Sequence, residues 1–100
     1  MAPRLTLRST VTVPDRTAAR QVDAETILLN LESGIYFGLD EVGTRMWQLI
    51  AAGIPLAGVH EALTREYDVE PARLETDLIA LVEELAGHGL IEVVTDGGAK

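Results

Sequence analysis

The sequence predicts an α+β domain in which a small three-stranded antiparallel sheet comes first and a bundle of three helices follows. Up to Leu39 apolar and polar residues alternate with a period of two, which is typical of half-buried strands. From Asp40 onward apolar residues recur every three or four positions, which is typical of amphipathic helices. Because the strands precede the helices, the helices should pack on one face of the sheet. A β-ribbon with three helices is also the inventory of a winged helix-turn-helix.

The first third of the chain is expected to be β-structure. The segment "RLTLRSTVTV" alternates from Leu5 to Val13 and favours one or two short strands, whose partner the sequence leaves open. "ARQVD" is a weak strand, and a turn over residues 23–25 leads into the stronger strand "TILLNL". The loop Glu32–Ser33–Gly34 then connects to a further strand, "IYFGL".

The strand "IYFGL" places two aromatic residues side by side. Because successive strand residues point to opposite faces, Ile35, Phe37 and Leu39 share one face, which we expect to pack on the helices. Tyr36 would then point outward, together with Gly38. The sequence leaves open whether Tyr36 serves recognition by another protein or covers a cross-strand neighbour such as Leu28.

Three helices are predicted from residue 40 onward. Asp40 is a good N-cap for the first helix, which should end near Gly53. Pro55 fits the first position of the second helix and Pro71 that of the third. The apolar stripes of the three helices are, in order, Val42, Met46, Leu49 and Ile50; Leu56, Val59, Leu63 and Tyr67; and Leu74, Leu78, Leu81, Val82 and Leu85. "IEVV" would add a last strand, which gives a single domain over residues 1–95 and a disordered tail over residues 96–100.

Composition narrows the class of protein. Sixteen acidic and eight basic side chains give a formal net charge of −8, which argues against a nucleic-acid partner because phosphate binding relies on Lys and Arg. No apolar run approaches the ~18 residues of a membrane span, and the first residues do not resemble a signal peptide. Cysteine is absent, which excludes disulfides and thiol nucleophiles. We therefore expect a cytoplasmic protein with no membrane partner, either a monomer or a weak dimer.

The motifs of catalysis are missing. Gly34, Gly38 and Gly43 do not form a phosphate-binding loop, because they do not follow a strand into a helix at the required spacing. His60 and His88 belong to different elements, and we expect them to have capping or surface roles. The sequence therefore predicts no catalytic residue, no metal site and no cofactor.

The "IYFGL" strand lacks the features that usually protect a sheet edge. It contains no proline, lysine or charged residue. An unprotected apolar edge either carries a risk of aggregation or serves as a docking site for an added strand. On the third helix, Asp77 lies near the border of the apolar stripe, where a carboxylate either caps a neighbouring backbone group or pairs with a basic group of a partner.

Several linked segments resemble a known family. "ILLNLESGIYFGLDEVGTRMWQLI", followed after a helix by "EYDVEPARLETDLIALVEELAGHGLIE", is similar to the pyrroloquinoline-quinone biosynthesis protein D-like (PqqD-like) family. These small domains, also called RiPP recognition elements, bind ribosomally made peptides that are later modified. The resemblance runs from about Val13 to Val93, and the "SGIYFGL" block looks most like stand-alone members that bind lasso-peptide leaders.

The resemblance implies a function and a site. It implies a winged-helix-like domain that is a peptide chaperone and not an enzyme, and that binds the leader segment of a precursor peptide as an additional antiparallel strand. It also implies that the domain presents the precursor to a leader peptidase or another maturation enzyme. The residues that it places at the site lie on the matching strand and the matching helix, and they are Ile35, Tyr36, Phe37, Gly38, Leu39, Arg73, Leu74, Asp77, Leu78 and Leu81.

Two other function classes stay open from the sequence. A winged-helix DNA-binding regulator would need Lys and Arg on its recognition helix, where the second helix offers only Arg65 and the third only Arg73. A structural or dimerising domain without a peptide ligand is the other alternative.

Overall fold

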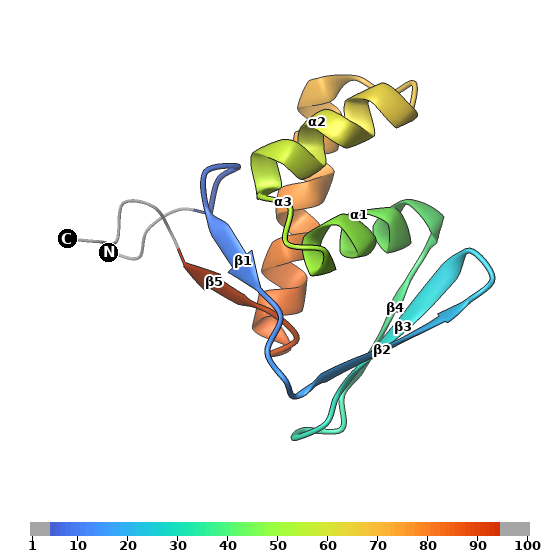
Figure 1. Ribbon diagram of the computed structural model, residues 1–100, viewed down its shortest axis with the longest axis vertical. Helices are drawn as coiled ribbons and strands as arrows, with labels where there is room; N and C mark the ends of the chain where they lie inside the picture. The colour runs from blue at the N-terminus through green and yellow to red at the C-terminus, as the bar shows by residue number, and fades with distance from the viewer. Residues whose placement is uncertain (1–4, 95–100) are drawn as a thin grey trace.

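The computed structural model describes residues 5–94, and its elements follow the expected order (Figure 1). The sequence-based prediction of an α+β domain with a three-stranded antiparallel sheet and three helices is confirmed. The elements are β1 (Thr10–Thr12), β2 (Thr17–Val22), β3 (Glu25–Asn30), β4 (Tyr36–Leu39), α1 (Glu41–Ala51), α2 (Leu56–Glu66), α3 (Pro71–Gly87) and β5 (Glu92–Val94). The expected tail over residues 96–100 lies outside the described residues.

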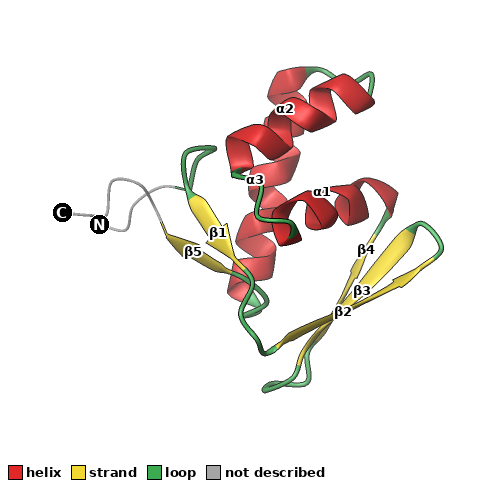
Figure 2. Cartoon of the chain, viewed as in Figure 1, coloured by secondary structure: helices red, strands yellow, loops and turns green. Residues whose placement is uncertain are grey.

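The strands form two separate antiparallel sheets (Figure 2). β2, β3 and β4 follow one another as a meander, which we call the hairpin sheet, and β1 pairs with β5 in a two-stranded ribbon. The alternating segment at residues 5–13 therefore yields only one strand, because Ser9 N–H bonds back to Thr6 O (3.0 Å) and forms a turn before Thr10. The sequence left open which strand pairs with this segment, and the structure shows that it is β5, the last strand.

The turn between β2 and β3 is one residue shorter than predicted. Val22 pairs with Glu25, so Asp23 and Ala24 alone form the loop. Asp23 has φ 57°, in the left-handed region that two-residue hairpin turns require and that Asp tolerates better than most residues.

One expectation about the faces of the hairpin sheet is wrong. Leu28 does not share the outer face with Tyr36: it is fully buried and lies opposite Phe37 on the helix side. The residue opposite Tyr36 is Leu29, and Tyr36 is 71% exposed, as expected for an outward side chain. The inward face of β3 holds Thr26, Leu28 and Asn30. Because successive strand residues point to opposite faces, choosing the wrong inward face for β3 misplaces every side chain of the strand.

The expected inward face of β4 is only partly buried. Leu39 is buried and Phe37 is half-buried against the core, but Ile35 precedes the strand and is 40% exposed. The helix-side packing therefore begins at Phe37, because Ile35 still belongs to the loop that connects β3 to β4.

The helices begin and end close to their predicted limits. The Asp40 side chain accepts a hydrogen bond from Gly43 N–H (2.8 Å), which confirms Asp40 as the N-cap of α1. Pro55 is the N-cap of α2, so this helix begins at Leu56, one residue later than predicted, and Pro71 begins α3. Gly53 has φ +89° just beyond the end of α1, a conformation that favours glycine.

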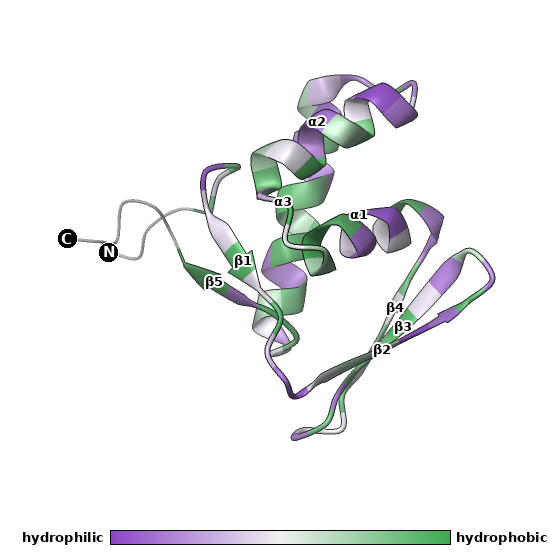
Figure 3. Ribbon diagram, in the orientation of Figure 1, coloured by the Kyte–Doolittle hydropathy of each residue, from purple (hydrophilic) through white to green (hydrophobic). Residues whose placement is uncertain are grey.

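The core lies where the three helices meet the hairpin sheet. Each helix carries both apolar and polar segments in the hydropathy view (Figure 3). The apolar sides bury against one another, and the largest fully buried side chains are Leu28, Leu56, Val59, Leu63, Leu78, Val82, Leu85, Leu90 and Ile91.

Hydrogen bonds attach the hairpin sheet to the C-terminal end of α3. Asn30 Nδ2 donates to His88 O (3.0 Å), and Asn30 Oδ1 accepts from Glu32 N–H and Ser33 N–H. Thr17 Oγ1 donates to Leu90 O (2.7 Å) in the same region. These bonds satisfy backbone groups at the end of a helix and in a turn, which would otherwise be left without partners.

We predict that Asn30→Ala destabilises the protein by about 2 kcal/mol, because the buried amide makes three hydrogen bonds and each contributes roughly 0.5–1.5 kcal/mol. The free energy of unfolding from urea denaturation measures the effect. Glu25→Ala, at an exposed position of β3, is the control and should change it by less than about 0.5 kcal/mol. An Asn30→Ala variant as stable as the control would show that these bonds do not hold the sheet to the helix.

Candidate functional site

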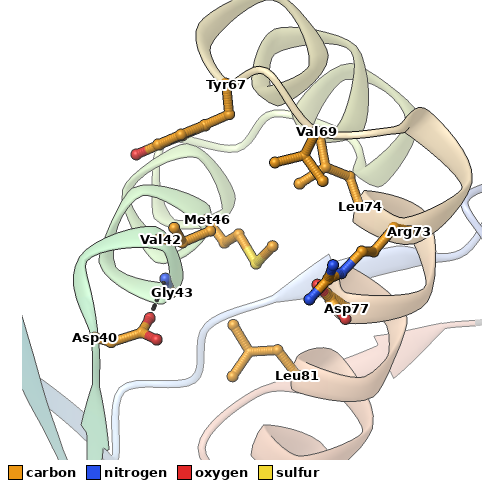
Figure 4. Close-up of a pocket in the computed structure, with 10 residues that line it drawn as sticks. All are labelled: Asp40, Val42, Gly43, Met46, Tyr67, Val69, Arg73, Leu74, Asp77 and Leu81. Atoms are coloured by element: carbon orange, nitrogen blue, oxygen red, sulfur yellow. Dashed lines mark hydrogen bonds and ion pairs between the residues drawn. The ribbon is translucent and has the colours of Figure 1, made fainter.

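An open groove of about 450 Å³ lies between the N-terminal half of α1 and α3 (Figure 4). Side chains of α1 line one wall, side chains of α3 line the other, and the α2–α3 connection closes one end. The lining residues are Asp40, Val42, Gly43, Met46, Tyr67, Val69, Arg73, Leu74, Asp77 and Leu81. The groove therefore combines an apolar floor with charged groups at its rim.

The structure brings together part of the residue set expected from the sequence. Four of the five expected α3 residues line the groove: Arg73, Leu74, Asp77 and Leu81. Leu78 is fully buried in the core, so it acts on the groove only through packing. No residue of the Ile35–Leu39 segment lines the groove, although the strand leads directly into it, because Asp40 follows Leu39.

The charged groups at the rim are largely accessible. Arg73 Nε lies 4.0 Å from Asp77 Oδ2 one helical turn away, and both side chains are more than half exposed. An exposed pair of this kind contributes little to stability, so both groups can exchange partners at small cost. The Asp40 carboxylate, on the opposite wall, is held in place by the N-cap hydrogen bond to Gly43 N–H.

An ion pair fixes the end of the groove formed by the α2–α3 connection. Arg45 of α1 donates from Nε and Nη2 to the two carboxylate oxygens of Glu66, both at 2.8 Å. These hydrogen bonds lower the pKa of Glu66 and raise the pKa of Arg45. Because Glu66 is the last residue of α2, the pair anchors the point where the chain turns toward Tyr67 and Val69.

The second candidate feature is the outer edge of β4. Within residues 5–94 β4 pairs only with β3. Asn30 N–H bonds to Ile35 O (2.9 Å), and in an antiparallel ladder bonded and non-bonded residues alternate. Phe37 thus bonds to β3, whereas the backbone N–H and C=O groups of Tyr36 and Gly38 point away from β3. Two residues therefore offer free donors and acceptors on a strand that leads into the groove.

The histidines occupy structural positions. The His88 ring contacts Phe37 with ring centroids 5.5 Å apart, and His88 is the C-cap of α3. His60 Nε2 is 2.7 Å from Pro71 O, at the start of α3. Among the described residues no group of three or more His, Cys, Asp or Glu side chains could hold a metal ion.

Comparison with known proteins assigns the family. The family model described as coenzyme PQQ synthesis protein D (PqqD) matches residues 25–91. The chain belongs to the PqqD family. The match begins at β3 and ends just before β5, so it contains β4 and the whole groove.

Two solved structures resemble this PqqD-family chain closely. One is "TbiB1 in Complex with the TbiA(beta) Leader Peptide", with 36% identity, a TM-score of 0.79, and 84% of this chain and 98% of that chain covered. The other is "Lasso peptide synthetase B1 complexed with the leader peptide", with 30% identity, a TM-score of 0.75, and 83% and 98% covered. The winged-helix-like fold implied by the resemblance is confirmed. No curated protein sequence matches the chain significantly.

The charge and hydropathy of the helices bear on two other classes of partner, nucleic acids and membranes. Arg65 and Arg73, the basic residues of α2 and α3, both lie beside acidic residues one turn away. Over residues 5–94 no helix is long and apolar enough to cross a membrane.

Six of the ten residues that line the groove were not predicted as site residues from the sequence. Val42, Met46 and Tyr67 were assigned to apolar stripes facing the core, but each also contributes to the groove wall. Val69 lies in the short α2–α3 connection and is 38% exposed. The one sequence signal for the groove was Val69 itself, an isolated apolar residue in a polar connection. The helix residues gave no such signal, because helix periodicity does not show which part of an apolar stripe stays uncovered.

We predict that the stabilising effect of the Arg45–Glu66 pair is lost in acid. The folded-state pKa of Glu66 lies below its ordinary value of 4.5, so the contribution is complete above that pH and disappears as the pH falls through the lowered pKa. Urea midpoints of the wild type and Glu66→Gln should therefore differ at pH 7 and converge below pH 4.5. A difference that persists unchanged at the lowest pH would show that the carboxylate charge is not its source.

Proposed function

We propose that this PqqD-family chain is a non-catalytic peptide-binding module. Its ligand is the leader segment of a ribosomally synthesised precursor peptide, which adds to the edge of β4 as a further antiparallel strand. The observation that carries the proposal is the free edge at Tyr36 and Gly38, on a strand that leads into a groove of about 450 Å³.

In the proposed complex, backbone hydrogen bonds and side-chain contacts would contribute to peptide binding in different ways. Backbone bonds to Tyr36 and Gly38 would supply affinity without regard to sequence. Directly opposed residues of paired strands point to the same face, so the peptide residue opposite Phe37 would point toward the helices. Apolar side chains on that face of the peptide would meet the groove wall that contains Leu74 and Leu81.

The charges at the groove suggest a further preference. Two carboxylates, Asp40 and Asp77, line it with one guanidinium, and the whole chain carries a net charge of −8. A leader with basic residues beside its apolar positions would be attracted to this surface, and salt would weaken that part of the affinity. Ordering a flexible leader costs several kcal/mol, so we expect a dissociation constant of roughly nanomolar to micromolar.

Support from relatives extends to the class of ligand. The two similar solved structures are described as complexes with leader peptides, and one is described as a lasso peptide synthetase B1. We extend this to the present chain and propose that it presents a lasso-peptide precursor to a separate maturation enzyme, a leader peptidase.

We predict an alternating pattern of amide protection on peptide binding. The first probe is the TbiA(beta) leader peptide, which is present in the solved complex with TbiB1, a protein 36% identical to this chain. Hydrogen exchange followed by NMR should slow by about tenfold or more at Tyr36 and Gly38, because their N–H groups gain partners, whereas Phe37, already bonded to β3, should change little. Binding that leaves the exchange of Tyr36 and Gly38 unchanged would refute strand addition.

We also predict that Leu81→Glu weakens peptide binding about tenfold or more, which corresponds to about 1.4 kcal/mol or more, because it places a charge on the apolar wall of the groove. Fluorescence anisotropy with a labelled leader measures the dissociation constant. Ala80→Glu is the matched control, since Ala80 is exposed on the neighbouring position of α3 and does not line the groove. Circular dichroism confirms that both variants fold. Equal affinity of the two variants would show that the groove does not contact the peptide.

A further inference from the structure

Gly38 has no evident role within the chain itself. Its φ is not positive, in contrast to Gly34, Gly53 and Gly89, so the backbone does not require glycine. A Cβ atom built at Gly38 would have nothing within 4 Å, so packing does not require glycine either. Glycine weakens a strand and often marks a place where a ligand approaches closely.

The surroundings of Gly38 on the outer face are apolar and exposed. Ile27 lies directly opposite on β3 and is 46% exposed, and Tyr36, two residues earlier on the same face, is 71% exposed. Both side chains line a shallow depression of about 260 Å³, whose other lining residues are Ala18, Ala19, Arg20 and Leu29. Gly38 thus leaves a gap in an apolar surface at the edge of the hairpin sheet.

A strand added to β4 would place side chains on this face as well as on the groove side. The residue opposite Gly38 would point to the outer face, because directly opposed residues share a face. Cross-strand aromatic side chains are known to cover glycines at sheet edges, since they replace the contacts that the missing side chain cannot make. The position opposite Gly38 is therefore the one at which a bulky side chain of the ligand has both space and apolar neighbours.

We propose that the bound peptide carries a large apolar side chain, aromatic or branched, opposite Gly38. This side chain lies over the glycine and contacts Tyr36 and Ile27 on the outer face of the sheet. The proposal rests on the proposed function, strand addition to β4, and adds a second selectivity position on the face opposite the groove. Gly38 is thus a specificity-determining residue because it has no side chain.

The test compares the peptides that two forms of the full chain select. A displayed library of random 12-residue peptides is panned on the wild type and on Gly38→Val. The wild type should enrich a large apolar residue at one register position, and Gly38→Val should enrich glycine or alanine there, with the groove-facing preferences unchanged. A peptide selected by the wild type should bind Gly38→Val about tenfold more weakly, because the added side chain overfills the site, and alanine at that peptide position should restore affinity.

Controls separate a local effect from a general one. Gly38→Val should be at least as thermally stable as the wild type, since valine favours strands and its Cβ atom would meet nothing within 4 Å. If it is less stable, Gly38→Ala, which adds only the Cβ atom, replaces it in the same comparison. Thr12→Val, at an exposed position of β1, adds valine to the other sheet and should select the same peptides as the wild type.

The outcomes distinguish the two proposals. If the wild type enriches no peptide that slows exchange at Tyr36 and Gly38, strand addition fails and this inference fails with it. If the wild type enriches such peptides but Gly38→Val selects the same residues at every position, only the outer-face contact is refuted. A preference for small residues opposite Gly38 in the wild type would also overturn it.

Discussion

The attachment of the hairpin sheet to the C-terminal end of α3 is the constraint on which the rest of the structure depends. Asn30 bonds the carbonyl of His88, Thr17 bonds that of Leu90, and Arg16 Nε donates to Gly89 O at 2.8 Å. These bonds tie β2 and β3 to a helix that is distant in sequence. Because β4 is paired to β3, the same bonds set where its free edge lies relative to the groove wall on α3.

The two sides of β4 have different physical roles. Its paired side and the half-buried Phe37 hold it in the fold, whereas its unpaired side keeps the N–H and C=O groups of Tyr36 and Gly38 available. An unpaired edge usually carries a risk of aggregation, and charged or proline residues commonly protect it. The absence of such protection in "YFGL" fits a strand that is completed by a ligand, which is the basis of the proposed peptide-binding function.

The groove depends on a second long-range arrangement. α1 follows β4 after a single N-cap residue, Asp40, so the sheet fixes one wall. The Arg45–Glu66 pair and the α2–α3 connection fix its end, where Val69 lines the groove together with side chains of α1. An apolar groove with exposed charges at its rim has the composition of a peptide-recognition surface, in which apolar contacts supply affinity and charged groups influence the choice of ligand.

The sequence by itself determined the order of elements, the N-cap at Asp40, the outward orientation of Tyr36 and the family, because periodicity, capping and linked motifs are local signals. Only the tertiary structure decided that β1 pairs with β5, that Leu28 faces the core, and that Met46 and Val69 join α3 residues around the groove. Alternation shows which residues share a face but not which face is buried. That choice depends on packing between segments that are distant in the chain, such as β1 and β5, whose residues Thr10 and Val94 are paired.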